Sequence, residues 1–342
     1  MAEREEAMIA RIMEAFGASP DALIGIGDDA AVLDLGRTVI TTDLLIENVD
    51  FTRSIPLHFT GAKSLAANVS DLAAMGAVPG SFLMALGIPR DLLDDVQSLI
   101  GGMAAAASAW KISLVGGDLS AASELTIAIT ALGKLEKGVE PLRRSGARPG
   151  EAIFVSRPLG AAAAGLHLLA RGWRIDAAGA VTPPGDLPGA VGYSQREFAA
   201  AVIRRQVSPE PEHLLGPALA RGRLASACID ISDGLSTDLH RLCEASGVGA
   251  RIEWERIPRF PDLEGVGFSL GIDEAGAVLH GGEELALLFT SAGTESELSK
   301  KVGRPVYRIG RTSKEQGVKL VKSEAVSDLP RGGFDHFAPP QG

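Results

Sequence analysis

Short apolar runs alternate with longer stretches of helical periodicity through the first half of the chain. Short runs rich in branched residues predict strands, and apolar residues recurring every three or four positions predict helices. We expect strands at 30–35, 38–43, 81–89 and 125–135, and helices at 61–77 and 91–110. Strands and helices that alternate in this way indicate mixed α/β layers.

The second half repeats the alternation after a segment, 136–151, that concentrates glycine, proline and charge. Such a segment is typical of a domain connection, so we expect an N-terminal domain over 1–140 and a C-terminal domain over 141–342. The polar, proline-rich stretch 176–195 is predicted to be a loop. Further strands are expected at 152–157, 225–231, 284–290 and 306–312, and helices at 161–172, 212–223 and 236–247. Periodicity alone leaves α/β and α+β arrangements open.

Composition restricts the class of protein. Hydrophobic residues make up 46% and charged residues 22% of the 342 positions, which is a globular profile. The net charge of -10 argues against nucleic-acid binding, because neutralising phosphates requires a basic surface. The charged N-terminus lacks the pattern of a signal peptide, and no apolar run approaches the length of a membrane span. Two cysteines form no disulfide framework, so we expect a cytoplasmic protein without membrane contact.

Aspartates recur at the expected turns and strand ends. An isolated carboxylate in these apolar settings is costly unless it is paired or bound to a metal ion, and few lysines or arginines lie nearby in the sequence. Mg²⁺ prefers carboxylate, hydroxyl and phosphate oxygens, so the set favours metal and phosphate chemistry at a shared site. The positions are Asp28 in GIGDDAAVL, Asp43 closing the run 38–43 behind Thr41 and Thr42, Asp71 in NVSDLAAMG, Asp118 after SLVGG, and Asp230 and Asp233 in DISDGL.

Three other motifs are weak. Residues 25–30 partly match a dinucleotide-binding fingerprint, but they would set two carboxylates where a pyrophosphate must approach. The GFSLG of 267–271 matches a nucleophile elbow, yet no apolar strand precedes Ser269. The GAKS of 61–64 lacks the upstream glycine of a P-loop, because position 56 is proline. Any ATP is therefore bound without a P-loop.

Six ordered motifs resemble those of the thiamine-monophosphate kinases, which belong to the superfamily of aminoimidazole ribonucleotide synthetase and selenophosphate synthetase. They are GIGDDAAVL, TTDLLIENVDF, NVSDLAAMGAVP, GGDLS, RSGARPGE and DISDGLSTDL, and the likeness continues to GFDHF near the C-terminus. The resemblance implies a two-domain α/β fold whose N-terminal sheets pair across a homodimer. It implies ATP-dependent phosphorylation of thiamine phosphate to thiamine diphosphate by direct in-line transfer.

The resemblance also implies roles for individual residues. Transfer of a phosphoryl group mainly needs charge neutralisation and positioning, which clustered aspartates around Mg²⁺ ions would supply. The implied Mg²⁺ ligands are Asp28, Thr41, Thr42, Asp43, Asp71, Asp118, Asp230 and Asp233, with Asp43, Asp71 and Asp118 as the catalytic set. The implied nucleotide contacts are Gly117, Asp118, Arg144 and Ser232, and the implied acceptor contacts are Asp50, Glu283 and Phe334.

Departures from the family pattern fall mostly on the acceptor side. Position 50 is Asp where the family usually has His, and Leu285 and Ala286 replace a Tyr and an acid. Loss of that Tyr is expected to remove a stacking surface for the acceptor. Two alternatives therefore stay open beside the kinase: a superfamily paralogue that phosphorylates or activates a different small molecule, and a nucleotide-binding regulatory protein without turnover.

Overall fold

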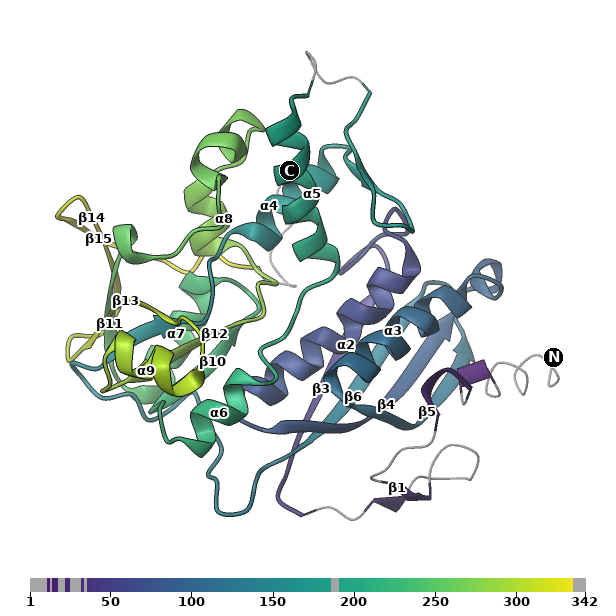
Figure 1. Cartoon of the computed structure of the whole chain (residues 1–342), viewed down its shortest axis with the longest axis horizontal. Helices are drawn as coiled ribbons and strands as arrows, with labels where there is room; N and C mark the ends of the chain where they lie inside the picture. Colours follow the sequence, from purple (N-terminus) through teal and green to yellow (C-terminus); the bar gives the residue numbers. More distant parts are fainter. Residues whose placement is uncertain are drawn as a thin grey trace.

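The computed structural model describes residues 11–12, 14–17, 22–24, 32–33, 36–185 and 191–334. Its larger elements form two units, each built on its own sheet: a four-stranded sheet in the N-terminal half and a seven-stranded sheet in the C-terminal half. In Figure 1 the N-terminal unit is drawn in purple and blue and the C-terminal unit in teal to yellow. The mixed α/β class expected from the sequence is confirmed.

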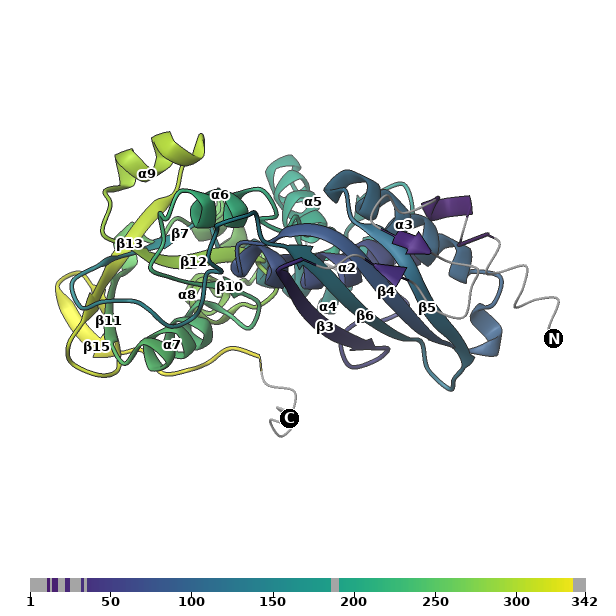
Figure 2. The same cartoon turned by 90° about the horizontal axis from the view of Figure 1, so that it is seen from below.

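The N-terminal sheet has the strand order β3-β6-β4-β5, with β4 and β5 parallel and the other pairs antiparallel. Two helices pack on one face of this sheet (Figure 2). The elements are β3 (Thr38–Ile46), α2 (Leu57–Ala74), β4 (Val78–Ile88), the 3-10 helix η1 (Arg90–Leu92), α3 (Val96–Trp110), β5 (Ser113–Ala121) and β6 (Thr126–Lys134), preceded by the short strands β1 (Ala22–Ile24) and β2 (Val32–Leu33).

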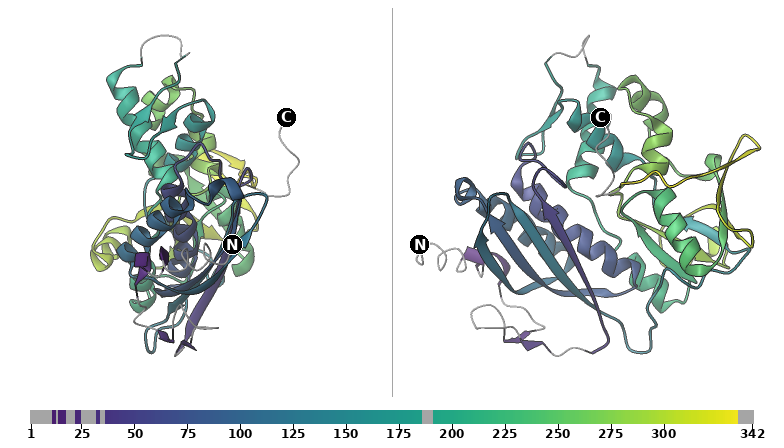
Figure 3. Two further views of the ribbon diagram at one scale, coloured as in Figure 1. Left: turned by 90° about the vertical axis from the view of Figure 1, so that its right-hand side faces the viewer. Right: turned by 180° about the vertical axis from the view of Figure 1, so that it is seen from behind.

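The other face of the N-terminal sheet is apolar and exposed. Side chains alternate along β3, so Ile40 and Leu44 point away from the helices and are 61% and 54% exposed. The ladder sets Leu44 opposite Ala128 and Leu83 opposite Thr130, which continues this surface across the sheet. Within the described residues no helix covers this face, as the view from behind shows (Figure 3).

The C-terminal sheet has the order β10-β12-β7-β13-β11-β14-β15 and is covered on both faces at its centre. One face carries Ile153 and Leu288 beneath α4, α5, α7 and α8, and the other carries Phe154 and Phe289 beneath α6 and α9. The four residues of β7 are all buried, as expected for a strand enclosed on both sides. The strands are β7 (Ala152–Val155), β10 (Ala227–Ile231), β11 (Gly249–Glu253), β12 (Ala286–Ser291), β13 (Tyr307–Ser313), β14 (Val318–Lys322) and β15 (Ala325–Asp328).

The connecting helices follow the chain between these strands. A small hairpin pairs β8, just before the predicted loop 176–195, with β9 inside that loop, and the last residues of the loop begin α5. The helices are α4 (Ala161–Ala170), α5 (Tyr193–Val207), α6 (Leu215–Arg221), α7 (Leu235–Ser246), α8 (Glu274–His280) and α9 (Glu295–Val302), with short turns η2 (Trp254–Arg256) and η3 (Leu263–Gly267), and the hairpin strands are β8 (Arg174–Ile175) and β9 (Val181–Thr182). None of the described helices is long and apolar enough to cross a membrane.

Two aspartates that were expected at turns or strand ends lie within strands. Asp43 lies within β3, since Leu44, Leu45 and Ile46 continue the strand beyond it. Asp118 lies within β5, since Leu119, Ser120 and Ala121 continue the strand and pair with β4. Helix α5 was not expected from the sequence, because its polar residues dilute its apolar periodicity, and the strands β11, β14 and β15 were not expected because they are short.

Helix α2 joins the two units because glycines let its neighbours approach it closely. A Cβ at Gly61 of α2 would lie 2.0 Å from the Leu99 carbonyl oxygen of α3, and one at Gly102 of α3 would lie 1.9 Å from the His58 carbonyl oxygen of α2. At the other end of α2, a Cβ at Gly216 of α6 would lie 1.9 Å from the Ala73 carbonyl oxygen. Larger side chains at these points would push the helices apart.

We therefore expect Gly102→Ala to destabilise the chain by about 1–3 kcal/mol, because the added methyl meets backbone that cannot move independently. The neighbouring Gly101 is a matched control, since a Cβ there meets nothing within 4 Å. Gly101→Ala should stabilise the chain by about 0.5–1 kcal/mol through helix propensity. Urea unfolding of both variants measures the difference, and equal effects at the two positions would contradict the close helix contact.

Candidate functional site

Aspartates from both units meet beside α2. The Thr41 hydroxyl of β3 donates to Asp71 Oδ2 of α2 at 2.5 Å, and Ser70 Oγ donates to Asp230 Oδ2 of β10 at 2.7 Å. Asp43 faces the same region as Thr41, because alternate residues of a strand share a face. Asp43 Oδ2 is buried and has no hydrogen-bond partner. A carboxylate oxygen left in this state is ready to accept a cation.

The electrostatics of this group favour cation binding. Burial, reinforced by the charge of Asp71, raises the pKa of Asp43 to about 6. Burial, again reinforced by Asp71, raises the pKa of Asp230 to about 7. Burial also raises the pKa of Asp71, against the opposing effects of the Thr41 hydroxyl and the Arg144 charge. These shifts mean that Asp71 repels both Asp43 and Asp230 in a poorly hydrated space, and a cation would relieve the repulsion.

A tight turn after β10 presents the end of DISDGL to the same region. Asp238 Oδ2 accepts hydrogen bonds from the backbone N–H groups of Ser232, Asp233 and Gly234, each at 3.1 Å. Arg241 bridges the carboxylates of Asp233 and Asp238. Burial, reinforced by the charge of Asp233, raises the pKa of Asp238 to about 6. Asp238 therefore holds the turn that carries Ser232 and Asp233.

Two further predicted residues attach to this turn through their backbones. The N–H of Glu283 donates to the Ser232 carbonyl at 2.7 Å, and the N–H of Phe334 donates to the Asp233 carbonyl at 3.0 Å. Three chain segments that lie more than fifty residues apart in sequence are thus held together at one place. The predicted acceptor contacts Glu283 and Phe334 lie next to the predicted metal and nucleotide contacts Asp233 and Ser232.

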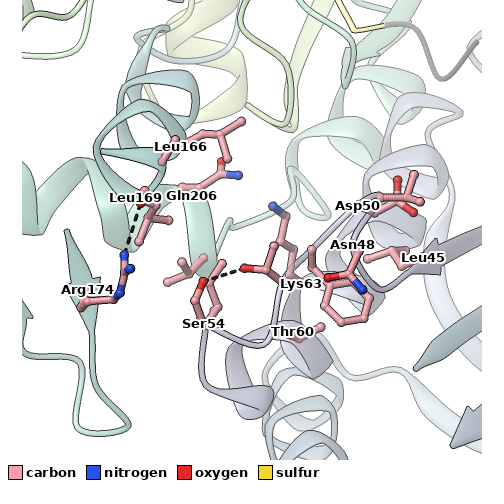
Figure 4. Close-up of a pocket in the computed structure, with 16 residues that line it drawn as sticks. Leu45, Asn48, Asp50, Ser54, Thr60, Lys63, Leu166, Leu169, Arg174 and Gln206 are labelled. Carbon is pink, nitrogen blue, oxygen red and sulfur yellow. Dashed lines mark hydrogen bonds between the residues drawn. The ribbon is translucent and has the colours of Figure 1, made fainter. Parts of the chain in front are cut away.

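A cavity of about 360 Å³ opens between the units beside α2. Figure 4 shows Asp50, Asn48 and Lys63 on one side of it and Leu166, Leu169, Arg174 and Gln206 on the other. The first group comes from the segment after β3 and from α2, and the second comes from α4, β8 and α5. Asp50 Oδ2 accepts the Ile46 N–H at 2.8 Å, which fixes the turn that lines the cavity. The cavity is large enough for a small organic molecule.

Adjacent glutamates after α8 point to different units. Lys63 Nζ of α2 lies 2.6 Å from Glu283 Oε1, which links the N-terminal unit to the C-terminal one. Glu284 Oε1 instead accepts the backbone N–H groups of Gly160 and Ala162 at the start of α4, at 2.8 and 3.0 Å. Burial raises the pKa of Glu284 to about 7, although these hydrogen bonds oppose the rise. Both glutamates line a second, smaller cavity of about 260 Å³.

Several predicted residues lie apart from the carboxylates. Thr42 Oγ1 turns to the other face of the sheet, where it donates to the Ile129 carbonyl at 3.0 Å. Asp118 is exposed and pairs with Ala85, in the row of Leu44 on the outer face. Gly117 allows a close strand approach, since a Cβ there would lie 1.9 Å from the Met84 carbonyl oxygen. Arg144 is near enough for its charge to affect Asp71, and Asp28 lies outside the described residues.

Sequence reasoning missed Ser70, Lys63, Gln206, Asp238 and Arg241. The signal for Lys63 was its spacing of eight residues from Asp71, which places both on one face of a helix, whereas Ser70 is adjacent to Asp71 and gave no such signal. Gln206 gave no such signal, since its partner Glu283 lies 77 residues away. Arg241 follows Asp238 by three residues on α7, a spacing at which opposite charges pair on a helix. Among the described residues, no three His, Cys, Asp or Glu side chains are gathered closely enough to form a metal-ion site by themselves. GFSLG is no nucleophile elbow, because no strand precedes Ser269.

Comparison with protein families identifies both units. The family described as AIR synthase related protein, N-terminal domain, matches residues 27–135, and its C-terminal domain counterpart matches residues 148–323. Thiamine-monophosphate kinase of Salmonella typhimurium is 32% identical over 352 residues, covering 99% of this chain and 100% of that protein. The enzyme of Bacillus subtilis is 31% identical over 335 residues, covering 92% of this chain and 93% of that protein.

Solved structures give the same result in three dimensions. Thiamine-monophosphate kinase from Stenotrophomonas maltophilia superposes with a TM-score of 0.77 at 34% identity, covering 92% of this chain and 95% of that one. AaThiL, solved in complex with AMPPCP and TMP, superposes with a TM-score of 0.74 at 28% identity, covering 97% of both chains. The hydrogenase maturation protein HypE shares the fold, with a TM-score of 0.73 at 18% identity.

The buried Glu284 should make stability depend on pH. Its pKa is about 7 in the folded chain against 4.5 when unfolded, so the folded state binds more protons between these values. Stability from this group is therefore present below pH 4.5 and is lost as pH rises through 7. We expect Glu284→Gln to resemble the parent chain at pH 5 and to be more stable at pH 8, by on the order of 2 kcal/mol.

Urea unfolding at both pH values tests this expectation. Glu264→Gln serves as the control, because Glu264 is exposed and its substitution should change stability equally at pH 5 and pH 8. A Glu284→Gln variant that is destabilised to the same extent at both pH values would show that Glu284 is ionised and well paired in the folded chain.

Proposed function

We propose that this chain transfers the γ-phosphoryl group of ATP to thiamine monophosphate. The product is thiamine diphosphate. The chain belongs to the AIR synthase related family and, within it, to the thiamine-monophosphate kinases. The observation that carries this proposal is the meeting of Asp43, Asp71 and Asp230 from two units beside a cavity of about 360 Å³. The named relatives share this chain over nearly its full length.

Magnesium ions are part of the proposal. Mg²⁺ is usually held in enzymes by one or two carboxylates together with water and substrate phosphates, so a cluster of protein ligands alone is not required. The partnerless Asp43 Oδ2 and the raised pKa values of Asp43, Asp71 and Asp230 fit such a cation. Bound Mg²⁺ would neutralise charge on the transferred phosphoryl group. The other proposed ligands are Asp28, Thr41, Thr42, Asp118 and Asp233. Thr42 and Asp118 lie on the outer face of the N-terminal sheet, so a metal ion would have to reach them from that face.

The chain's own residues position the reactants. Phosphoryl transfer needs the attacking and leaving oxygens in line and needs little covalent chemistry from the protein. Asp43, Asp71 and Asp230 supply a fixed negative surface from both units, and Thr41 and Ser70 hold two of these carboxylates in place. Arg144 lies close enough to contribute a positive charge to the nucleotide phosphates. Gly117, Asp118 and Ser232 remain proposed nucleotide contacts.

We assign the larger cavity to the acceptor. Thiamine monophosphate carries a cationic thiazolium ring, which suits the carboxylates of Asp50 and Glu283 at or beside this cavity. Asp50 in place of the family's His is compatible with that charge. Leu285 is buried and is not among the residues that line the cavity, so its difference from the family removes no stacking surface there. Phe334, which is half exposed beside Asp233, is the remaining aromatic candidate.

Two alternatives stay open: a paralogue that phosphorylates or activates a different small phosphorylated acceptor, which fits the change at Asp50, and a nucleotide-binding regulatory protein without turnover. Purified chain should form thiamine diphosphate from thiamine monophosphate with ATP and Mg²⁺, as measured by chromatography of the products. ATP consumption with a different acceptor, and none with thiamine monophosphate, would favour the paralogue. Nucleotide binding without consumption in any acceptor mixture would favour a regulatory protein.

The catalytic role of Asp43 can be separated from a structural one. Asp43→Asn should lower kcat by at least about 10²-fold, because it weakens stabilisation of charge in the transition state. The same variant should be no less stable than the parent at pH 8, since burial and Asp71 both disfavour the Asp43 carboxylate. Asp94→Asn is the control on an exposed surface and should leave kcat unchanged. Near-parental turnover by Asp43→Asn would remove Asp43 from the mechanism.

A homodimer is the second part of the proposal. The outer face of the N-terminal sheet exposes Ile40, Leu44 and Leu83, an apolar surface that a second copy would cover. Two such sheets packed face to face would bury these side chains as in a β-sandwich. Asp118 lies on the same face, so a second copy docked there would come close to it.

Dimerisation through this face predicts that Leu44→Glu lowers the molar mass in solution, because burying an unpaired charge in the contact is costly. Light scattering after size-exclusion chromatography measures the mass at a series of concentrations. Val326→Glu on β15 is the matched control, since Val326 is 49% exposed on the C-terminal unit. An unchanged dimer in Leu44→Glu would exclude this face as the contact.

A further inference from the structure

One ion pair lies between the larger cavity and the smaller one. Lys63 is largely buried, with 12% of its side chain exposed, and its ammonium group lies 2.6 Å from Glu283 Oε1. The other carboxylate oxygen of Glu283 accepts the side-chain amide of Gln206 at 2.5 Å. Lys63 and Gln206 both line the larger cavity (Figure 4), and Glu283 lines the smaller one. Within the described residues this cluster therefore forms the wall between the two cavities.

The larger cavity also holds polar atoms that lack partners. Thr60 and Gln206 are each only 3% exposed, and the buried atoms Thr60 Oγ1 and Gln206 Oε1 make no hydrogen bond. Buried polar atoms of this kind are uncommon in native structures, and each calls for an explanation such as a water molecule or a ligand. Thr60 and Lys63 lie nearly one helical turn apart on α2, so both face the same part of the cavity. These groups indicate a site for a polar ligand.

Charge balance shows which ligand fits. A phosphate entering the cavity would meet the carboxylates of Asp50 and Glu283, and Lys63 is already engaged by Glu283. A cation entering alone would compete with Lys63 for Glu283 and leave a largely buried ammonium group without a partner, which is costly. A molecule carrying both charges can replace both partners, so that neither side chain is left unpaired.

The backbone of Glu283 keeps its carboxylate at this position. The φ of Glu283 is 63° and that of Leu285 is 48°. Both lie in the left-handed region, which residues other than glycine rarely adopt. Hydrogen bonds from the Glu283 N–H to the Ser232 carbonyl and from the Leu285 N–H to the Ile231 carbonyl hold the segment. The segment thus connects the carboxylate that pairs with Lys63 to the turn that carries Ser232 and Asp233.

We propose that the Lys63–Glu283 ion pair is exchanged when the acceptor binds: Lys63 takes the acceptor's phosphate and Glu283 takes its organic cation. This inference rests on the proposed function and adds the residue that distinguishes a phosphorylated acceptor from its free alcohol. Lys63 shares a face of α2 with Asp71, about 12 Å along the axis at 1.5 Å per residue. A phosphate held by Lys63 would therefore lie over the face of α2 that also carries Asp71.

Three variants test the exchange. Lys63→Met removes the charge and keeps most of the stem, and Lys63→Arg keeps the charge. Lys300→Met on the exposed surface of α9 is the matched control. Calorimetry measures the affinity of each protein for thiamine monophosphate and for thiamine, in the presence of AMPPCP and Mg²⁺. Thiamine diphosphate formation gives KM and kcat, and thermal unfolding shows that each variant is folded.

The expected result is a loss of selectivity. Because a hydrogen bond to a charged group is lost, Lys63→Met should bind thiamine monophosphate about 10- to 100-fold more weakly. It should bind thiamine at least as well as the parent, since Glu283 is released from Lys63. The KM for thiamine monophosphate should rise, Lys63→Arg should recover most of the preference, and Lys300→Met should match the parent.

Two outcomes would overturn the exchange, and they are distinguishable. If the parent forms thiamine diphosphate and Lys63→Met keeps the parental ratio of affinities for thiamine monophosphate and thiamine, the exchange is wrong and the kinase function stands. A uniform loss of both affinities would likewise mean that Lys63 serves only to hold the two units together. If the parent forms no thiamine diphosphate and does not bind thiamine monophosphate, the proposed function fails and the exchange fails with it.

Discussion

The placement of carboxylates from two units against one helix is the constraint on which the rest of this structure depends. Ser70 and Asp71 are consecutive on α2, and they receive Asp230 from the C-terminal unit and Thr41 from the N-terminal sheet. Glycines at the contacts with α3 and α6 let those two helices approach the backbone of α2 closely. A shift of α2 by a fraction of a helical turn would separate the two sets of side chains, because each is carried by a rigid neighbour.

This arrangement opposes stability in the absence of a ligand. The pKa values of Asp43, Asp230 and Glu284 are all raised by burial, so each carboxylate is held in a setting that disfavours its charge. For Asp43 and Asp230 the neighbouring Asp71 adds repulsion. Functional sites often carry groups shifted in this way, because the same field that disfavours a carboxylate attracts the cation it must bind. Glu284 differs, since it is satisfied by two N–H groups at the start of α4 and serves to fix the loop.

Two consecutive glutamates after α8 make contacts with different units. Glu283 reaches across to Lys63 of α2, and Glu284 reaches back to α4 within its own unit. Glu283 itself has a positive φ of 63°. An ion pair that spans two units beside a cavity can respond to a charged ligand, whereas a buried carboxylate held by backbone N–H groups cannot move without unfolding its loop. The exchangeable contact and the fixed one therefore lie side by side.

The sequence by itself determined the elements and the kinds of chemistry. Apolar periodicity predicted β3, α2, β4, α3 and β6 close to their observed bounds, because each buries one strongly apolar face in the core. It missed α5 and the short strands β14 and β15, whose polar residues and brevity hide the period. Asp43, Asp71 and Asp230 were identified as a group because unpaired carboxylates in apolar settings need a cation. The resemblance of six motifs identified the family, which the comparisons confirm.

Only the tertiary structure decided which of those residues meet. The alternation of β3 sends Thr41 and Asp43 to the helix side of the sheet and Thr42 to the other side. Strand β5 continues past Asp118, so Asp118 lies within that strand on the outer face. Lys63, Gln206 and Glu283 come from three segments far apart in sequence, so no local pattern could have joined them. Burial sets the pKa values, and burial depends on how the two units pack. The sequence specifies the chemistry available to each side chain, and packing specifies its partners and its exposure to water.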